Sequence, residues 1–460
     1  MGKVKRFVPI YILAGTLSVS FGWPAELAEQ AALTLPEAVA LALERNQQVL
    51  IARAQDDGLR GRIREVRAQA LPSIALNGNG TRWRDPAFLN SASFDKIPEE
   101  FRSALVVKGA NLFDYNISVS QPLYTSGKVG TALKLASLEA EGVGVDRARV
   151  EQDIRLRVIG AFYDLVLAKQ LLEVSRETVA QREQHLAMAR ARLAAGVATE
   201  VDVLRSQVNL ANAQPELIRA ENAIRQARAV LNNLLVRPID YPTEAVGELA
   251  FVPLSRVDRD QLARHAIDRR PELQRLRINE LEAEAQKKLA NAESRLRLDF
   301  SGQYGFSARD PMNLWNHNFT RWMFSVNLGL PLFDGGRRSG LLQQAVAMSK
   351  VAKLTRVETE NSVRLEVQNA LDELERAEKT VEAARLTVRE AERVLTMMQD
   401  NYRYGAATTL DVTDAQTALA VARTNLWRGL YDHTLARARL RWVMGLNPLE
   451  STDAEPKSAN

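Results

Sequence analysis

FDYNISVSQPLYTSG at residues 113–127 returns 209 residues later as WMFSVNLGLPLFDGG at residues 322–336. The same shift aligns residues 113–236 on residues 322–445 without a gap. Within both quoted stretches apolar and aromatic residues alternate with polar ones, and this period of two indicates a β-strand. The chain therefore carries an internal repeat whose two copies each include such a strand.

The repeat extends upstream of these strands. Residues 37–80 align on residues 261–304 with a shift of 224, so the first copy holds 15 additional residues between Gly80 and Phe113. An insertion of this kind predicts a loop that is longer in the first copy. Each copy reads helix, strand, loop, strand, long helix, turn and helix.

Long helices are predicted after the second strand of each copy. Residues 127–195 contain no proline, and their apolar residues recur at steps of three and four, which is typical of a coiled-coil seam. Such a helix reaches ~100 Å at 1.5 Å per residue. The helices expected at 36–70 and 199–236 are about half as long, so two of them, stacked end to end, can line one long helix. Pro215 is expected to bend the second.

The N-terminus has the layout of a secretory signal peptide. Lys3, Lys5 and Arg6 precede an apolar run at residues 7–21, and we place the cleavage after Gly22. The alternative is a membrane anchor, but the run is shorter than the roughly 20 residues that a spanning helix needs. We expect a signal peptide at 1–22, one repeat at 23–245, a second at 246–446, and a polar tail at 447–460. Residues 237–258 are expected to form a linker outside the helices.

Composition narrows the class of protein. The chain has no cysteine, which excludes disulfides, thiolate metal sites and a lipidated N-terminal cysteine. Its net charge of +5 is small against 61 basic and 56 acidic residues, so we expect no nucleic-acid partner. The four histidines are scattered and no catalytic or phosphate-binding motif is present, so we expect no enzyme activity, cofactor or metal site.

Aromatic residues concentrate around the predicted strands. Fifteen of the 28 lie in residues 74–124 and 298–333. A soluble antiparallel sheet with one wet face is the alternative. The concentration resembles the aromatic girdles of membrane β-barrels and favours strands that meet a lipid bilayer. No segment after residue 22 is apolar for 18 residues, so we expect contact with a membrane to use strands.

The turns between the long and short helices carry the same motif in both copies. Gly196-x-x-Thr199-x-x-Asp202-Val203 corresponds to Gly405-x-x-Thr408-x-x-Asp411-Val412. With the order of elements, these turns resemble the outer-membrane efflux protein family typified by TolC. The resemblance implies an α+β membrane protein of Gram-negative outer membranes, in which a β-barrel continues as a periplasmic α-helical coiled-coil barrel.

Oligomerisation is expected even without the resemblance. Four strands cannot close a membrane barrel, for which about eight is the smallest known number, so two, three or four chains must associate. The resemblance selects a homotrimer, with four strands per chain in one shared barrel.

The implied function is that of a passive exit duct in a tripartite efflux pump or a type I secretion system. Its implied partners are a periplasmic adaptor, an inner-membrane transporter of the RND, ABC or MFS type, and outer-membrane lipid. Family members serve exporters of drugs, metal ions and proteins, and the sequence does not select among these cargoes. The alternative function is a periplasmic adaptor, although an adaptor is expected to carry one hairpin between β-domains, whereas this chain has two in tandem.

The resemblance also implies a gate at the helix tips. In the family the bent tips close the periplasmic end, with acidic rings in the lumen and a polar latch between hairpins. Tyr402-x-x-Gly405 with Asp411 and Asp414 matches the part that supplies the rings and one side of the latch. Asp202 matches the latch carboxylate of the other hairpin.

Two of these carboxylates have a simpler interpretation. Thr199 with Asp202, and Thr408 with Asp411, each fit a capping box that starts a helix. Ala407 stands where the type member has a latch arginine, so a different contact is expected to hold the closed state.

Asp414 fits no cap, and its counterpart in the first copy is Arg205. Three-fold symmetry would bring Asp411 and Asp414 of each chain together as six carboxylates around one axis. The resemblance places adaptor docking at the same turns, with Gly196, Thr199, Gly405 and Thr408 as candidate contacts.

Overall fold

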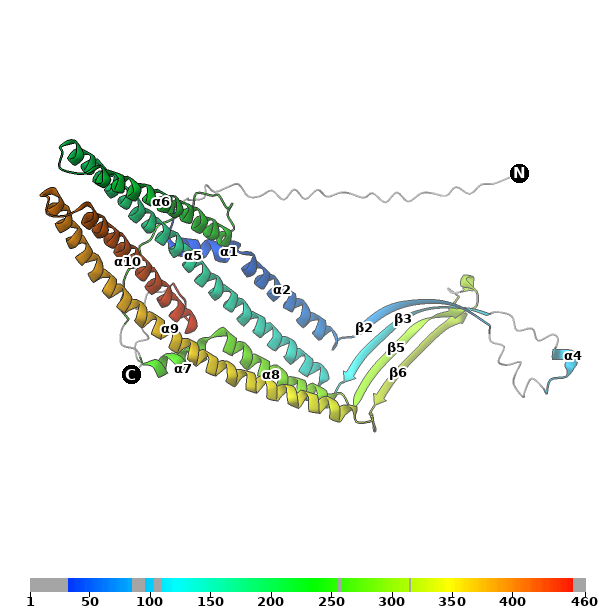
Figure 1. Ribbon diagram of the computed structural model, residues 1–460. Helices are drawn as coiled ribbons and strands as arrows, with labels where there is room; N and C mark the ends of the chain where they lie inside the picture. Colours follow the sequence, from blue (N-terminus) through cyan, green and yellow to red (C-terminus); the bar gives the residue numbers. More distant parts are fainter. Residues whose placement is uncertain (1–31, 85–95, 103–109, 255–257, 314–315, 450–460) are drawn as a thin grey trace, which may run out of the picture.

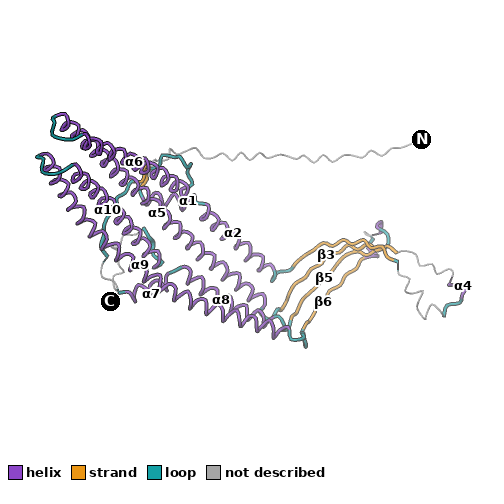
Figure 2. Tube along the Cα trace, in the orientation of Figure 1, coloured by secondary structure: helices purple, strands orange, loops and turns teal. Residues whose placement is uncertain are grey.

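A computed structural model describes residues 32–84, 96–102, 110–254, 258–313 and 316–449. The molecule is elongated, with long antiparallel helices over most of its length and a curved four-stranded sheet at one end (Figures 1 and 2). The expected signal peptide, and the expected tail from residue 450 on, lie outside the described residues.

The four longest helices form two hairpins. α5 (Lys128–Ala194) and α9 (Arg337–Arg403) have 67 residues each, and their limits differ by the 209 residues of the sequence repeat. α6 (Glu200–Leu235) folds back along α5, and α10 (Thr409–Val443) folds back along α9. α6 continues through Pro215 as one helix.

Shorter helices extend the two folded-back helices toward the sheet. α1 (Leu35–Arg45) and α2 (Gln47–Ala68) line α5, while α7 (Arg259–Arg269) and α8 (Pro271–Ala292) line α9. The single helix expected at 36–70 is wrong, because Asn46, at φ −63° and ψ 128°, ends α1 and precedes α2. Arg270 adopts the same backbone angles between α7 and α8 of the second repeat. Arg270 precedes Pro271, which disfavours the helical conformation there, and the Asn46 side chain caps α2.

The sheet contains β2 (Ser73–Trp83), β3 (Ala110–Tyr124), β5 (Arg297–Ala308) and β6 (Thr320–Gly329), antiparallel throughout and in that order. Paired residues share a face in an antiparallel sheet. One row therefore places Leu76, Ile117, Tyr304 and Trp322 on an apolar face. The adjacent row places Ala75, Ser118, Gln303 and Met323 on the opposite, mostly polar face. β2 and β6 are the edges.

Short elements complete the described structure. They are β1 (Ala32–Leu33), α4 (Glu99–Arg102), β4 (Glu244–Ala245) and two turns of 3₁₀ helix, η2 (Pro311–Asn313) and η3 (His317–Phe319). None of the helices in the described ranges combines the length and apolarity that a membrane crossing requires.

The described part of the segment predicted as a linker, residues 237–254, lies outside the helices as expected, and it also packs on the first repeat. β4 pairs with β1 in parallel, and Ala245 and Leu249 are buried in the main hydrophobic core beside Phe162 of α5. The segment after α6 thus ties β1 to the middle of the first hairpin.

A candidate gate at the hairpin tips

Each hairpin turns through a glycine that ends the long helix. Gly196 has φ +74° and Gly405 has φ +78°, a left-handed conformation that glycine adopts without steric penalty. Three residues later Thr199 and Thr408 cap the following helices. The shared sequence motif therefore describes a tight helix-to-helix turn, and it places two short polar side chains at each tip.

Asp202 and Asp411 both complete capping boxes. Asp202 Oδ2 accepts hydrogen bonds from the Thr199 backbone N–H at 3.0 Å and from its hydroxyl at 2.7 Å. Asp411 Oδ2 accepts the corresponding bonds from Thr408 at 2.8 and 2.7 Å. These bonds to the threonines hold the pKa of both carboxyl groups below its usual value. Both side chains are therefore anionic and locally bound at neutral pH.

Tyr402 lies where the two hairpins meet. It is 4% exposed, and the Arg192 guanidinium of α5 lies over its ring at 4.6 Å. Arg192 Nη1 also donates to the Tyr402 backbone carbonyl at 2.6 Å. The His185 ring packs 5.2 Å away, and burial lowers the pKa of His185, which keeps it neutral beside Arg192. A cation over an aromatic face in a partly dry site is a stabilising contact.

A chain of polar contacts joins the same four helices. The Thr409 hydroxyl of α10 lies 3.4 Å from Tyr402 Oη of α9 and 3.4 Å from Asp202 Oδ1 of α6. Arg192 adds α5 to the set. Tyr402 and Asp202, which the family resemblance implies for the two sides of a latch, lie in one cluster and are joined through Thr409.

Asp414 is not part of this cluster. Its side chain is exposed, as is that of Asp411 three residues earlier on α10. Ala407 lies within the turn and is partly exposed. The roles of Asp411, Asp414, Asp202 and Tyr402 in a gate, and of the four turn residues in adaptor docking, stay predictions.

Sequence reasoning missed Arg192, His185 and Thr409. His185 and Arg192 are seven residues apart, so they lie on one face of α5, and His185 occupies an otherwise apolar seam position. That periodicity was the available signal. A single sequence does not show that Arg192 of the first hairpin contacts Tyr402 of the second.

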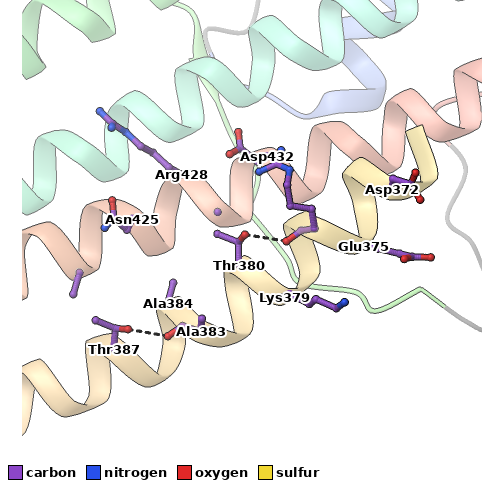
Figure 3. A pocket seen from close by; sticks show the side chains of 13 residues that line it. Asp372, Glu375, Lys379, Thr380, Ala383, Ala384, Thr387, Asn425, Arg428 and Asp432 are labelled. Carbon is purple, nitrogen blue, oxygen red and sulfur yellow. Dashed lines mark hydrogen bonds between the residues drawn. The ribbon is translucent and has the colours of Figure 1, made fainter. Parts of the chain in front are cut away.

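Two grooves run along α10 away from the tips. One, of about 840 Å³, lies between α9 and α10 and is lined by charged side chains that include Asp372, Glu375 and Lys379 (Figure 3). The other, of about 420 Å³, lies among α5, α6 and α10. Both include Asn425 and Arg428, so they adjoin. Among the residues that the structure describes, no acidic and histidine side chains are grouped to hold a metal ion.

Comparison with known proteins matches both repeats to one family. The description "Outer membrane efflux protein" matches residues 38–236 and 262–446. The outer membrane protein TolC of Vibrio cholerae is 25% identical over 449 residues, which cover 96% of each chain. The alkaline protease secretion protein AprF of Pseudomonas aeruginosa is 25% identical over 435 residues, covering 93% of this chain and 87% of AprF.

A solved structure shares the fold. The Campylobacter jejuni CmeC outer membrane channel superposes with a TM-score of 0.77 at 16% sequence identity, covering 91% of this chain and 87% of CmeC. The names of these relatives do not favour the alternative of a periplasmic adaptor.

Proposed function

Because the chain belongs to the outer membrane efflux protein family, it is a subunit of an outer-membrane efflux channel, and we propose that three copies build that channel. The strands of the three copies form one barrel, and their helices form one duct below it. The subunit is passive and performs no chemistry on its cargo.

The free edges of the sheet carry this proposal. β2 and β6 each have one neighbouring strand in the described part of the chain, so each leaves a row of backbone donors and acceptors without strand partners. The apolar face exposes large side chains, with Leu76 77% and Trp322 68% exposed. An apolar face in lipid requires paired edges, because lipid offers no hydrogen bonds.

The helices present matching free sides. Across the tips the order is α6, α5, α10 and α9, and nearer the sheet it is α2, α5, α8 and α9. α9 is therefore one lateral edge, and α2 and α6 form the other. Both edges expose apolar side chains, namely Met348, Val351, Leu354 and Leu365 on α9, and Leu50, Ile51, Val208 and Ile218 on α2 and α6.

The hairpin tips are the proposed contact for a periplasmic adaptor, and through it for an inner-membrane transporter. The tips lie at the end of the molecule opposite the sheet (Figure 1). If the sheet lies in the outer membrane, the tips are the part that reaches farthest toward the inner membrane. Gly196, Thr199, Gly405 and Thr408 form the two turns there.

The same tips are the proposed gate. Asp411 and Asp414 supply a ring of carboxylates around the three-fold axis, and the cluster of Tyr402, Arg192 and Asp202 holds the two hairpins of each subunit together. Arg192 supplies the arginine contact that Ala407 cannot make. Crowded like charges attract cations and favour a constriction that multivalent cations block.

Native mass spectrometry in mild detergent tests the trimer. Three copies are expected, with trimers also trapped by chemical crosslinking. A stable monomer under the same conditions would remove the proposed assembly.

Single-channel recording in planar bilayers tests the gate. Asp411→Asn with Asp414→Asn is expected to abolish block by multivalent cations while the trimer stays intact. Asp400→Asn is the control, because Asp400 is an exposed carboxylate of α9 that pairs with Arg403. Unchanged block in the double variant would exclude the two carboxylates from the gate.

A further inference from the structure

The two repeats share their internal contacts as well as their elements. Asn77 of β2 pairs with Asn116 of β3. Their counterparts in the second repeat are Ser301, which is 224 residues after Asn77, and Ser325, which is 209 residues after Asn116. These two residues also pair, between β5 and β6. The ion pair of Arg147 with Asp56 at 3.1 Å returns at the same shifts as Arg356 with Glu280 at 2.7 Å. The repeat therefore preserves strand register and side-chain pairing.

The interface between the two repeats is also defined in residue detail. β3 of the first pairs with β5 of the second, with Ser118 opposite Gln303 and Asn116 opposite Gly305. α5 packs on α8, where Gly142 leaves space for the Arg275 guanidinium. In the second repeat β6 and α9 correspond to β3 and α5, which form one half of this interface. In the first repeat β2, α2 and α6 correspond to β5, α8 and α10, which form the other half.

We propose that neighbouring copies in the channel pair through these free sides with the register of the internal interface. This inference rests on the proposed trimer and adds its residue contacts. Applying the two shifts to the β3–β5 pairs places Asn327 of one copy opposite Asn79 of the next, and Ser325 opposite Thr81. On the apolar face it places Val326 opposite Gly80 and Leu328 opposite Gly78.

The side chains fit this register. Asn327, Ser325, Asn79 and Thr81 all project from the mostly polar face. On the other face the Tyr115 and Phe113 rings of β3 lie over Gly78 and Gly80, so in this register Leu328 and Val326 would pack against aromatic rings instead of β2 side chains. A slip by one residue would set apolar side chains of β6 on the face opposite to those of β2, which a sheet with one face in lipid excludes.

The helices agree with the strands. The same shifts turn the Gly142–Arg275 contact into one between Val351 of α9 and Ile51 of the neighbouring α2. Val351 is 62% exposed and Ile51 57% exposed in the single subunit. Two apolar side chains thus meet at the position where the internal interface has an arginine over a glycine, and their burial favours association.

Engineered disulfides test the register, since the chain contains no cysteine. Asn327→Cys with Asn79→Cys, and Ser325→Cys with Thr81→Cys, are expected to give covalent trimers after oxidation, seen on non-reducing gels and lost on reduction. The swapped combinations, Asn327→Cys with Thr81→Cys and Ser325→Cys with Asn79→Cys, are the matched controls. Their Cβ atoms would be about 7 Å apart, beyond the ~4 Å of a disulfide, so much less covalent trimer is expected.

Three results overturn the register. One is efficient crosslinking by either swapped pair with little by the matched pairs. Another is a native trimer in which no pair crosslinks. Both would leave the trimer itself standing, whereas a native monomer would remove the register together with the proposed assembly.

Discussion

The two repeats break their short helices at equivalent positions with different chemistry. In the first, Asn46 accepts from the Gln48 N–H at 3.0 Å and donates to the Leu234 carbonyl at 3.1 Å. In the second, Arg270 is 4% exposed, pairs with Glu272 and Glu366, and lies 5.2 Å from the Trp442 ring. The backbone angles are nevertheless equal.

This difference shows that the backbone break is retained while its stabilisation is free to vary. A neutral cap needs one acceptor and one donor. A buried arginine needs carboxylates around it, because an unpaired charge is costly to bury. The repeats should therefore respond differently when equivalent residues are changed, and the following substitutions measure that asymmetry.

The largest effect is expected at Gly305 of β5, whose counterpart in β2 is Thr81. A Cβ at Gly305 would lie 1.9 Å from the Tyr115 carbonyl oxygen of β3, so Gly305→Ala must separate the two strands. We expect a loss of about 3 kcal/mol or more in folding stability, measured as a lower denaturation midpoint. Gly329→Ala, where a Cβ meets no atom within 4 Å, should change little. Equal effects would contradict the close contact of Gly305 with β3.

The next largest effect is expected at Arg270, the charged joint between α7 and α8. Arg270→Met removes the cation between Glu272 and Glu366, and Glu272 then remains largely buried with Arg149 at 3.6 Å as its other basic neighbour. A loss of about 3 kcal/mol is expected from denaturant unfolding. The adjacent Arg269→Met is the control, because Arg269 is exposed. A stable Arg270→Met variant would mean that packing alone holds the joint.

Acid should weaken the second repeat through His433, whose counterpart in the first is Ile224. His433 is fully buried against Phe251, and burial, with Arg437 and Arg385 nearby, lowers its pKa to about 4, although Glu378 lies 3.9 Å from Nε2. The folded pKa lies below the unfolded value near 6.5, so this stabilisation is complete above pH 6.5 and is lost as the pH falls toward 4.

At pH 4.5 the folding stability lost through His433 amounts to about 2.5 kcal/mol relative to neutral pH. Thermal denaturation between pH 7.5 and 4.5 should show a smaller shift in His433→Ile, which carries the residue of the first repeat. Identical acid shifts in the variant and the parent protein would exclude His433 as the cause.

The smallest effect is expected at Asn46, the neutral joint between α1 and α2. Asn46→Ala loses the α2 cap and the bond to Leu234, which should cost about 1.5 kcal/mol. Asn46→Asp keeps the acceptor and loses the donor, so it separates the two contributions. If Asn46→Ala destabilised the protein as much as Arg270→Met, the proposed asymmetry between the joints would be incorrect.

Much of the fold could be predicted from the sequence, because the repeat offsets of 209 and 224 reappear in the limits of α5 and α9 and of α2 and α8. The break at Asn46 was missed because its flanking residues keep helical periodicity, and a cap inside such a run has no distinct spacing. At the site, the capping boxes were readable because they are local. The contact of Arg192 with Tyr402 joins residues 210 positions apart, which no local pattern reports.

The sheet with two bare edges has a consequence for the life of the protein in the cell. A lone subunit exposes strands that any other chain can extend, so unassembled copies are prone to aggregate. If the barrel closes only when three subunits meet, the rate of assembly falls more steeply than the concentration of subunits. A modest reduction in synthesis would then reduce the number of assembled channels disproportionately. The unassembled subunits would become substrates for periplasmic proteases.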